Sequence, residues 1–376
     1  MTKIGFLLIL AFYLGIHSLL FLRGWQALPA KPGLQAAYAI IFIISALSFP
    51  VGMALGNWLP YWLTSVLENI GAWWVIALLY FILAIILGDL IRLVHRIFDI
   101  YPHWIKDHYE QVKFIYLLSV IGLFTIFSLI GNYRFAHPSV REIELEIPKG
   151  DGPAGTLTLV AASDVHLGNI IRKNRLRKYV DLLNRQNPDV ILFAGDLIDH
   201  SIRPVEVQNL DEDLRKLEAP LGVYGIFGNH EYYGNISRAV DFYKRSGITL
   251  LRDTAISIDN RFLLIGRDDI SQHMRKPLAD ILSHTDTNLP KILLEHNPVR
   301  MTDARKAGID LQISGHTHNG QIFPINHMVK RIYPLAYGYQ KSGNTHYYVS
   351  SGLGLWAAPI RIGTRSEIVK IKITLI

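Results

Sequence analysis

The sequence predicts an α/β domain, a two-sheet sandwich flanked by helices, preceded by a four-helix transmembrane domain. Two observations predict this architecture. Half of the 376 residues are hydrophobic, and the long apolar runs are crowded into the first third of the chain. Beyond residue 155, short apolar runs typical of buried strands alternate with segments of amphipathic helical spacing. Because this length favours more than one domain, we predict a transmembrane domain over residues 1–135, a linker over 136–155 and a water-soluble α/β domain over 156–376.

Each of four apolar segments is about long enough, at 1.5 Å per helical residue, to cross a hydrocarbon core of about 30 Å. The first segment follows Lys3 and could instead be a signal peptide. Its apolar run exceeds the usual length of roughly 7 to 15 residues, and no good cleavage signal follows it. We therefore expect a multi-pass protein of the cell membrane. The predicted spans are Ile4 to Leu22, Ala36 to Leu55, Ala72 to Val94 and Phe114 to Ile130.

Basic residues are unevenly distributed among the connections between these spans. The connection between the second and third spans contains no lysine or arginine, whereas the other two connections are basic. The positive-inside rule places basic connections in the cytoplasm, so everything after Ile130 is expected on the extracytoplasmic side. Basic residues that closely follow the last span argue in the opposite direction. The basic residues of the two connections are Arg23, Lys31, Arg92, Arg96, Lys106 and Lys113, and those after the last span are Arg134, Arg141 and Lys149.

The formal net charge of +7 is compatible with an anionic partner. Basic residues also gather beside membrane helices and near anionic substrates, so we expect a lipid bilayer as partner and no nucleic acid. Within the spans, His17 and Asp89 could mark a polar path. We expect instead that His17 makes an interhelical hydrogen bond and that Asp89 pairs with Arg92. The chain has no cysteine, so any metal must be bound by nitrogen and oxygen ligands.

The second part of the chain reads as alternating strands and helices, with further β-rich segments towards the end. This order is typical of an α/β layered fold. The predicted strands are Leu157 to Ala162, Val190 to Ala194, Val223 to Phe227 and Ile292 to Leu294; the helices are Lys173 to Gln186, Val205 to Leu217 and Ser237 to Ser246; the β-rich segments are Ile248 to Ile265, Tyr347 to Ser350 and Ile368 to Leu375.

Polar residues with metal-binding chemistry follow the predicted strands. Since loops beyond the carboxyl ends of strands meet at one crevice in an open α/β sheet, we expect these side chains to converge. Two aspartates, several imidazoles and an amide form a donor set suited to Mn, Fe, Zn or Ni rather than to Ca or Mg alone. A lone pair of such residues is weak evidence, but five elements at successive strand ends are not. They are Asp164 and His166, Asp196 and Asp199, Asn229 and His230, His296, and His316 and His318.

This ordered set resembles the calcineurin-like metallophosphoesterase superfamily, and the segments Gly315 to Gln321 and Pro359 to Ile368 resemble its bacterial membrane-associated branch. The resemblance implies a four-layer α/β/β/α sandwich that binds two divalent metal ions, with manganese the first expectation and Fe, Zn or Ni as alternatives. It also implies that a metal-bridging hydroxide attacks a phosphoester or pyrophosphate bond. The implied ligands of one ion are Asp164, His166, Asp196 and His318, and those of the other are Asp196, Asn229, His296 and His316, with Asp196 as the bridge.

The resemblance further implies that His230 donates a proton to the leaving group and that Asp199 orients His230. A helix N-cap is the alternative role for Asp199. Gly195, Gly228 and Gly315 each precede a ligand and are expected to permit close approach of the backbone. Arg361 could bind an anion or pair with Glu367, as could Arg365, and His200 could contact substrate or lie on the surface.

The sequence thus predicts a membrane-anchored, metal-dependent phosphohydrolase. A phosphorylated lipid or lipid-linked substrate is favoured, because an anchored domain gains effective concentration towards lipids. A phosphodiesterase for soluble nucleotides is the alternative enzyme. A metal-binding membrane scaffold without activity is the alternative of a different class.

Overall fold

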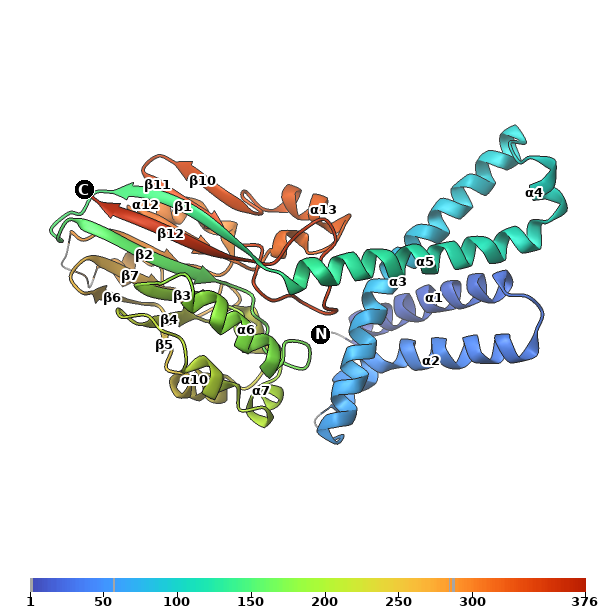
Figure 1. Cartoon of the computed structure of the whole chain (residues 1–376), viewed down its shortest axis with the longest axis horizontal. Coiled ribbons are helices and arrows are strands. Elements are labelled where there is room, and N and C mark those ends of the chain that lie inside the picture. Colours follow the sequence, from blue (N-terminus) through green and yellow to red (C-terminus); the bar gives the residue numbers. More distant parts are fainter. Residues whose placement is uncertain (1–2, 57, 284, 286–287) are drawn as a thin grey trace. The chain divides into compact units, whose positions relative to one another are not determined.

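The computed structural model describes residues 3–56, 58–283, 285 and 288–376. It contains two compact units, Met1–Leu129 and Ile130–Ile376. Figure 1 shows the long helices of the first unit and the layered sheets of the second.

The first unit is entirely helical where it has regular structure. Four of its helices are long and apolar enough to cross a membrane, which confirms the four predicted spans over the described residues. The third helix begins earlier than the predicted span at Ala72, because the preceding segment continues the helix without a break. The helices are α1 (Lys3–Ala27), α2 (Pro32–Leu55), α3 (Tyr61–Phe98), the short α4 (His103–Asp107) and α5 (Tyr109–Ala136), whose residues 130–136 belong to the second unit.

Polar contacts at His17 and Asp89 are among those that join the helices of the first unit. Trp74 Nε1 donates a hydrogen bond to His17 Nε2 over 3.0 Å, which links α3 to α1. Asp89 forms ion pairs with Arg92 and, at 3.0 Å, with Arg23. Both predicted pairings are therefore confirmed, and His17 and Asp89 each have a partner on another helix.

The second unit is built on two six-stranded sheets. The first has the order β1-β12-β2-β3-β4-β5 and the second the order β10-β11-β9-β8-β7-β6. Strands β2 to β5 are mutually parallel, as are β7, β8, β9 and β11. The strands are β1 (Ser139–Ile147), β2 (Gly155–Ala162), β3 (Val190–Ala194), β4 (Val223–Ile226), β5 (Thr249–Leu250), β6 (Thr254–Ile258), β7 (Phe262–Gly266), β8 (Lys291–Leu294), β9 (Leu311–Ser314), β10 (Gly338–Ser342), β11 (Thr345–Val349) and β12 (Glu367–Leu375).

Successive side chains of a central strand point to opposite faces of its sheet, so each apolar run supplies two cores. In β3, Leu192 packs into the core between the two sheets, whereas Phe193 packs beneath helices α6, α7, α8 and α10. A third core lies beneath α11 and α12 on the second sheet. The predicted four-layer α/β/β/α sandwich is confirmed. The helices are α6 (Lys173–Asn184), α7 (Arg203–Val207), α8 (Leu210–Leu214), α9 (Asn229–Tyr233), α10 (Ile236–Arg245), α11 (Leu278–Leu282), α12 (Met301–Lys306) and α13 (Ile325–Ile332), with the 3-10 helices η1 (Pro298–Arg300) and η2 (His318–Gly320).

Part of the predicted linker over 136–155 is a strand, so the prediction was wrong for this segment. Strand β1 runs parallel to β12 at the edge of the first sheet, with Ser139 beside Glu367. Leu145 and Ile147 are buried and alternate with exposed glutamates. This period of two is a strand signal, but the flanking proline and glycine residues obscured it.

One predicted helix, Val205 to Leu217, is two short helices. Asn209 interrupts it with a left-handed backbone, at φ 50° and ψ 52°, between α7 and α8. Asparagine adopts this conformation more readily than most residues. The apolar spacing survives the interruption because Val205, Leu210 and Leu214 still reach the same core.

The end of α5 is part of the second unit's core. Phe135 is 2% exposed and packs with the side chains beneath the helical layer. Arg361 donates its backbone N–H to the Gly131 carbonyl over 3.0 Å, and Arg175 Nη1 donates to the Ala136 carbonyl over 3.1 Å. The last turns of α5, which follow the fourth predicted span, are therefore a structural element of the α/β unit.

Candidate metal centre

The predicted site residues follow the carboxyl ends of parallel strands. Asp164 follows β2, Asp196 follows β3, Asn229 follows β4, His296 follows β8 and His316 follows β9. Parallel strands in one sheet direct these ends to the same edge, and in this fold the ends of both sheets contribute.

The backbone at these strand ends is unusual. Five of the predicted ligands have a positive φ: Asp164 at 52°, His166 at 51°, Asp196 at 52°, His316 at 68° and His318 at 49°. Left-handed backbone costs free energy in residues other than glycine and concentrates at functional sites. The surrounding structure therefore holds these loops in one conformation that aims their side chains.

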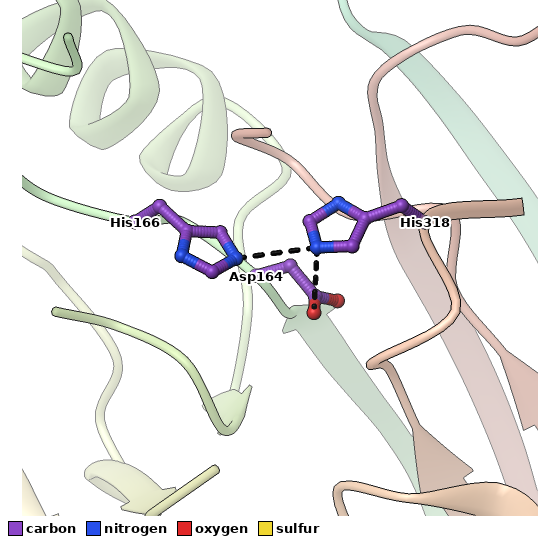
Figure 2. Close-up of side chains that lie close together, drawn as sticks. All are labelled: Asp164, His166 and His318. Atoms are coloured by element: carbon purple, nitrogen blue, oxygen red, sulfur yellow. Dashed lines mark hydrogen bonds and ion pairs between the residues drawn. The ribbon is translucent and has the colours of Figure 1, made fainter. Parts of the chain in front are cut away.

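One group of potential ligands consists of Asp164, His166 and His318, with donor atoms that all lie within 4.8 Å of one another. Figure 2 shows the two imidazole rings turned towards each other above the carboxylate. His166 Nε2 lies 3.2 Å from His318 Nε2, and His318 Nε2 lies 3.4 Å from Asp164 Oδ1. Two ring nitrogens and a carboxylate oxygen thus face one small space, as the ligands of a cation do.

A second group consists of Asp164, Asp196 and His296. His296 Nε2 lies 3.2 Å from Asp196 Oδ2. On the other side of the ring, His296 Nδ1 lies 2.8 Å from the Ala194 carbonyl. A hydrogen bond of this kind fixes the ring's orientation in metal sites and leaves Nε2 as the ligand atom.

Asp196 lies close to both groups. Its Oδ2 is 3.7 Å from His166 Nε2 as well as 3.2 Å from His296 Nε2. Its Oδ1 accepts a hydrogen bond from the His230 backbone N–H over 2.9 Å. Asp164 is also shared, since it belongs to both groups. The position of Asp196 is compatible with the predicted bridge, and the role itself stays a prediction.

Asn229 and His316 complete the predicted ligand set. His316 Nδ1 lies 2.9 Å from Asn229 Oδ1. The His316 backbone N–H donates to Asp164 Oδ1 over 2.9 Å, and its ring centroid lies 5.2 Å from that of His296. The structure therefore brings all seven predicted ligands into one cluster.

His230 and Asp199 lie beside this cluster and contact each other. His230 Nδ1 is 2.9 Å from Asp199 Oδ1. No hydrogen bond from the Asp199 side chain caps a helix, because α7 begins four residues later behind Ile202. The N-cap alternative is therefore wrong. Asp199 Oδ1 also lies 3.6 Å from His166 Nδ1, so His166, Asp199 and His230 form a third group of potential ligands.

The electrostatics of the cluster favour bound cations. Burial by itself would raise the pKa of Asp164 and of Asp196, but the neighbouring histidines lower both. Burial would lower the pKa of His296, and the two aspartates instead hold it well above its ordinary value. Two buried carboxylates thus draw positive charge into the site. Burial also lowers the pKa of His318 to about 3, so its ring stays neutral and can act as a ligand.

Several buried nitrogens of the cluster lack a hydrogen-bond partner among the described residues. They include His296 Nε2, which faces Asp196, together with His166 Nδ1 and His318 Nδ1. A buried polar atom without a partner is costly. Buried imidazole nitrogens beside carboxylates form a donor set that suits a first-row divalent metal, so the residues present fit the expected ions.

Two of the three glycines show why no larger residue fits before a ligand. A Cβ atom on Gly228 would lie 2.2 Å from Asp196 Oδ1, and one on Gly315 would lie 2.4 Å from Asp164 Oδ2. Both distances are far below van der Waals contact. The prediction that these glycines let the backbone approach the site is confirmed.

Arg361 has a role that the sequence did not indicate. Its side chain is completely buried, and neither anion binding nor an ion pair with Glu367 describes it. Nη2 donates to three carbonyls and Nη1 donates to the carbonyl of His318 over 3.3 Å. The guanidinium therefore fastens the loop after β11 to a predicted metal ligand. The three carbonyls accepting from Nη2 are those of Ser351 (2.7 Å), Gly352 (3.1 Å) and Gly354 (2.6 Å).

Glu231 is a second residue whose role only the structure reveals. Its buried carboxylate accepts hydrogen bonds from the backbone of Gly228 over 2.8 Å and of Ile198 over 2.9 Å. A third bond comes from the backbone of Asp196 over 3.2 Å. Glu231 thus ties the loop after β4 to the loop after β3. In the sequence, the position of Glu231 next to His230 was the feature that could have indicated a role in the site.

Comparison with known proteins identifies the family. The family model for calcineurin-like phosphoesterases matches residues 157–320. An uncharacterized metallophosphoesterase of Helicobacter pylori is 32% identical over 73% of this chain and 74% of its own length. An uncharacterized metallophosphoesterase of Campylobacter jejuni is 33% identical over 70% of this chain and 71% of its own. A Danio rerio protein described as a transmembrane protein with metallophosphoesterase domain is 30% identical over 68% of this chain and 61% of its own. The chain therefore belongs to the calcineurin-like metallophosphoesterase family.

Proposed function

We propose that this protein is a membrane-anchored phosphohydrolase that uses two divalent metal ions, preferentially manganese, to cleave a phosphoester or pyrophosphate bond. The observation that carries the proposal is the pair of adjacent ligand groups that share Asp164, with Asp196 close to both. Two such groups side by side match the requirement of two-metal hydrolysis for closely spaced cations.

Each residue of the cluster has an assigned task. Asp164, His166, Asp196 and His318 hold one cation, and Asp196, Asn229, His296 and His316 hold the other. When bound, the two cations supply Lewis acidity that lowers the pKa of water and stabilises negative charge on phosphoryl oxygens. Fixed ligand positions matter because reactants must be held in line for displacement at phosphorus.

His230 donates the proton that the leaving oxygen requires. Burial by itself would lower the pKa of His230, but the hydrogen bond to Asp199 and the charge of Asp196 outweigh it and raise the pKa. A raised pKa favours the protonated imidazole that a general acid requires. Because Nδ1 of His230 is hydrogen-bonded to Asp199, the other ring nitrogen, Nε2, is available to the leaving group.

The favoured substrate is a phosphorylated lipid or a lipid-linked diphosphate. The support is the group of four long apolar helices on the same chain, which confines the catalytic unit to a bilayer surface and raises its effective concentration towards lipids. A soluble nucleotide is the alternative, with the helices serving only for localisation. A screen of full-length protein in lipid nanodiscs separates the two.

The screen compares a long-chain substrate with a water-soluble analogue that carries the same phosphorylated headgroup. The lipid proposal predicts a higher kcat/KM for the long-chain compound, together with low activity towards nucleotide diesters. Equal kcat/KM values for the two headgroup compounds, or preference for the nucleotide, would refute the lipid assignment while leaving phosphohydrolysis intact. A scaffold without activity predicts no metal-dependent turnover of any compound.

We also propose that the catalytic unit lies on the extracytoplasmic side. The support is the basic character of the connections after the first and third spans. Protease added to sealed right-side-out vesicles should digest residues 137–376. Digestion only after the vesicles are opened would place the unit in the cytoplasm.

A further inference from the structure

The first unit contains a cavity among its helices. Its volume is about 540 Å³, and all its lining residues lie between Leu20 and Ile121. The wall is mainly apolar and includes the aromatic side chains of Phe42, Trp74 and Phe81. Pockets for small molecules in proteins have volumes of about 300–1,000 Å³, so the space is large enough for part of a lipid.

The charged residues of the lining are Arg23, Arg92 and Lys113, all of them basic. Arg23 and Arg92 belong to the last turns of α1 and α3, and Lys113 belongs to the first turns of α5. The three cations therefore lie towards the same side of the first unit. A cavity with an apolar wall and basic residues on one side has the two-part chemistry of a lipid site.

The neighbouring carboxylates do not balance these cations. Asp89 alone pairs with both Arg23 and Arg92. Lys113 lies 2.8 Å from Glu110, but the Glu110 side chain is 80% exposed and its attraction is screened by water. An excess of positive charge remains beside the apolar wall.

We propose that this cavity binds an anionic phospholipid, with an acyl chain along Phe42, Trp74 and Phe81 and its phosphate at Arg23, Arg92 and Lys113. Guanidinium groups bind phosphate oxygens through paired hydrogen bonds, and an apolar wall next to them is complementary to an acyl chain and not to a free anion. None of the residues that line this cavity belongs to the metal centre, and the inference does not depend on the proposed catalytic function.

Two kinds of variant separate the chain-binding part of the site from the phosphate-binding part. Gly88 lines the cavity, and a Cβ atom there meets the nearest atom, of Tyr116, at 3.5 Å, so Gly88→Leu fills the space without a backbone clash. Its matched control is Gly122→Leu, because Gly122 is outside the lining and has nothing within 4 Å of a Cβ atom. Arg92→Gln removes one cation while Asp89 keeps Arg23 as partner, and the exposed Arg96 supplies the control Arg96→Gln.

The test is native mass spectrometry of full-length protein in detergent, mixed with equal amounts of phosphatidylglycerol and phosphatidylcholine. The wild type should retain phosphatidylglycerol preferentially. Each removed cation should lower the fraction of protein that retains phosphatidylglycerol by about fivefold. Gly88→Leu should lower the same fraction without changing the melting temperature. Both control variants should match the wild type.

Three results would overturn the proposal. They are equal retention of the two lipids by the wild type, equal retention by Gly88→Leu and Gly122→Leu, and displacement of bound phosphatidylglycerol by millimolar glycerol 3-phosphate. The last result would indicate a site for a free phosphate and not for a lipid. Arg92→Gln and Gly88→Leu act on different parts of the site, so misfolding of one still leaves the other to decide.

Discussion

His230 Nδ1 lies 2.9 Å from Asp199 Oδ1, beside a cluster of metal ligands to which neither residue is assigned. Burial alone would raise the pKa of Asp199, but hydrogen bonds with His166, His200 and His230 hold it well below its ordinary value. An ionised carboxylate on Nδ1 orients the ring and stabilises its protonated form. In the proposed function, this pair supplies the general acid, a role that a site storing metal does not require.

Replacing His230 should reduce turnover without removing metal. We predict that His230→Asn lowers kcat by about 10²–10⁴-fold for an alkyl phosphodiester, the usual contribution of general acid catalysis. The loss should be smaller with a leaving group that is stable as an anion, because it needs no proton. Steady-state kinetics and metal analysis of the same samples check this.

The control for His230→Asn is His200→Asn. His200 Nδ1 also approaches Asp199, at 3.2 Å, but its side chain is 41% exposed. Turnover within a few-fold of wild type is expected for this control. A lower metal content in His230→Asn would contradict the account, because it would make His230 a ligand of the third group of potential ligands.

The pH dependence should report on the same pair. His230 must be protonated to donate, so activity is present below its pKa and is lost as the pH rises through it. Asp199 is one cause of the raised pKa of His230. The descending limb of the kcat/KM profile against pH should therefore move to lower pH in Asp199→Asn. A limb at the same pH as in the wild type would show that Asp199 does not raise the pKa of His230.

Metal binding should release a proton. His296 has a pKa well above its ordinary value in the absence of cations, because Asp196 and Asp164 outweigh the opposing effect of its burial. A cation that binds Nε2 must displace that proton, so metal affinity should rise with pH and about one proton should leave near neutral pH. Calorimetric titration in two buffers of different ionisation enthalpy measures the release. No dependence of the heat on the buffer would contradict the prediction.

Arg361 should stabilise the second unit and position the metal ligands. Arg361→Met leaves four carbonyls without their donor, which should cost at least about 3 kcal/mol. For a unit of this size, the loss corresponds to a decrease of roughly 6–12 °C in Tm. The exposed Arg365 provides the control Arg365→Met, with an expected change within about 0.5 kcal/mol. Equal Tm values for the two variants would show that the buried hydrogen bonds of Arg361 do not contribute to stability.

The sequence predicted the site better than it predicted the sheets. Each ligand lies within a few residues of a strand end, so short motifs and one topological rule placed Asp164, Asp196 and Asn229 together. Strand β1 was missed because flanking proline and glycine residues obscured its period of two, and because its partner β12 lies more than 200 residues away in the chain. Long-range pairing of this kind is set by the packing of the whole domain.

Roles that depend on burial were also beyond the sequence. From the sequence Arg361 could bind an anion or pair with Glu367, whereas the structure shows it donating to four carbonyls. Glu231 has no role in the predicted site, whereas in the structure its carboxylate joins two loops. Charged residues are seldom fully buried without partners, so their environment has to be known before a role can be assigned.

In the proposed function, Asp196 helps to bind two catalytic cations. The most direct measurement is hydrolysis of bis-p-nitrophenyl phosphate with added manganese, with metal content determined in parallel, for wild type, Asp196→Asn and the control Asp181→Asn. Asp181 is an exposed residue of α6. The account predicts metal-dependent turnover by wild type and Asp181→Asn, and loss of both turnover and bound metal in Asp196→Asn. Equal turnover by all three proteins would contradict it.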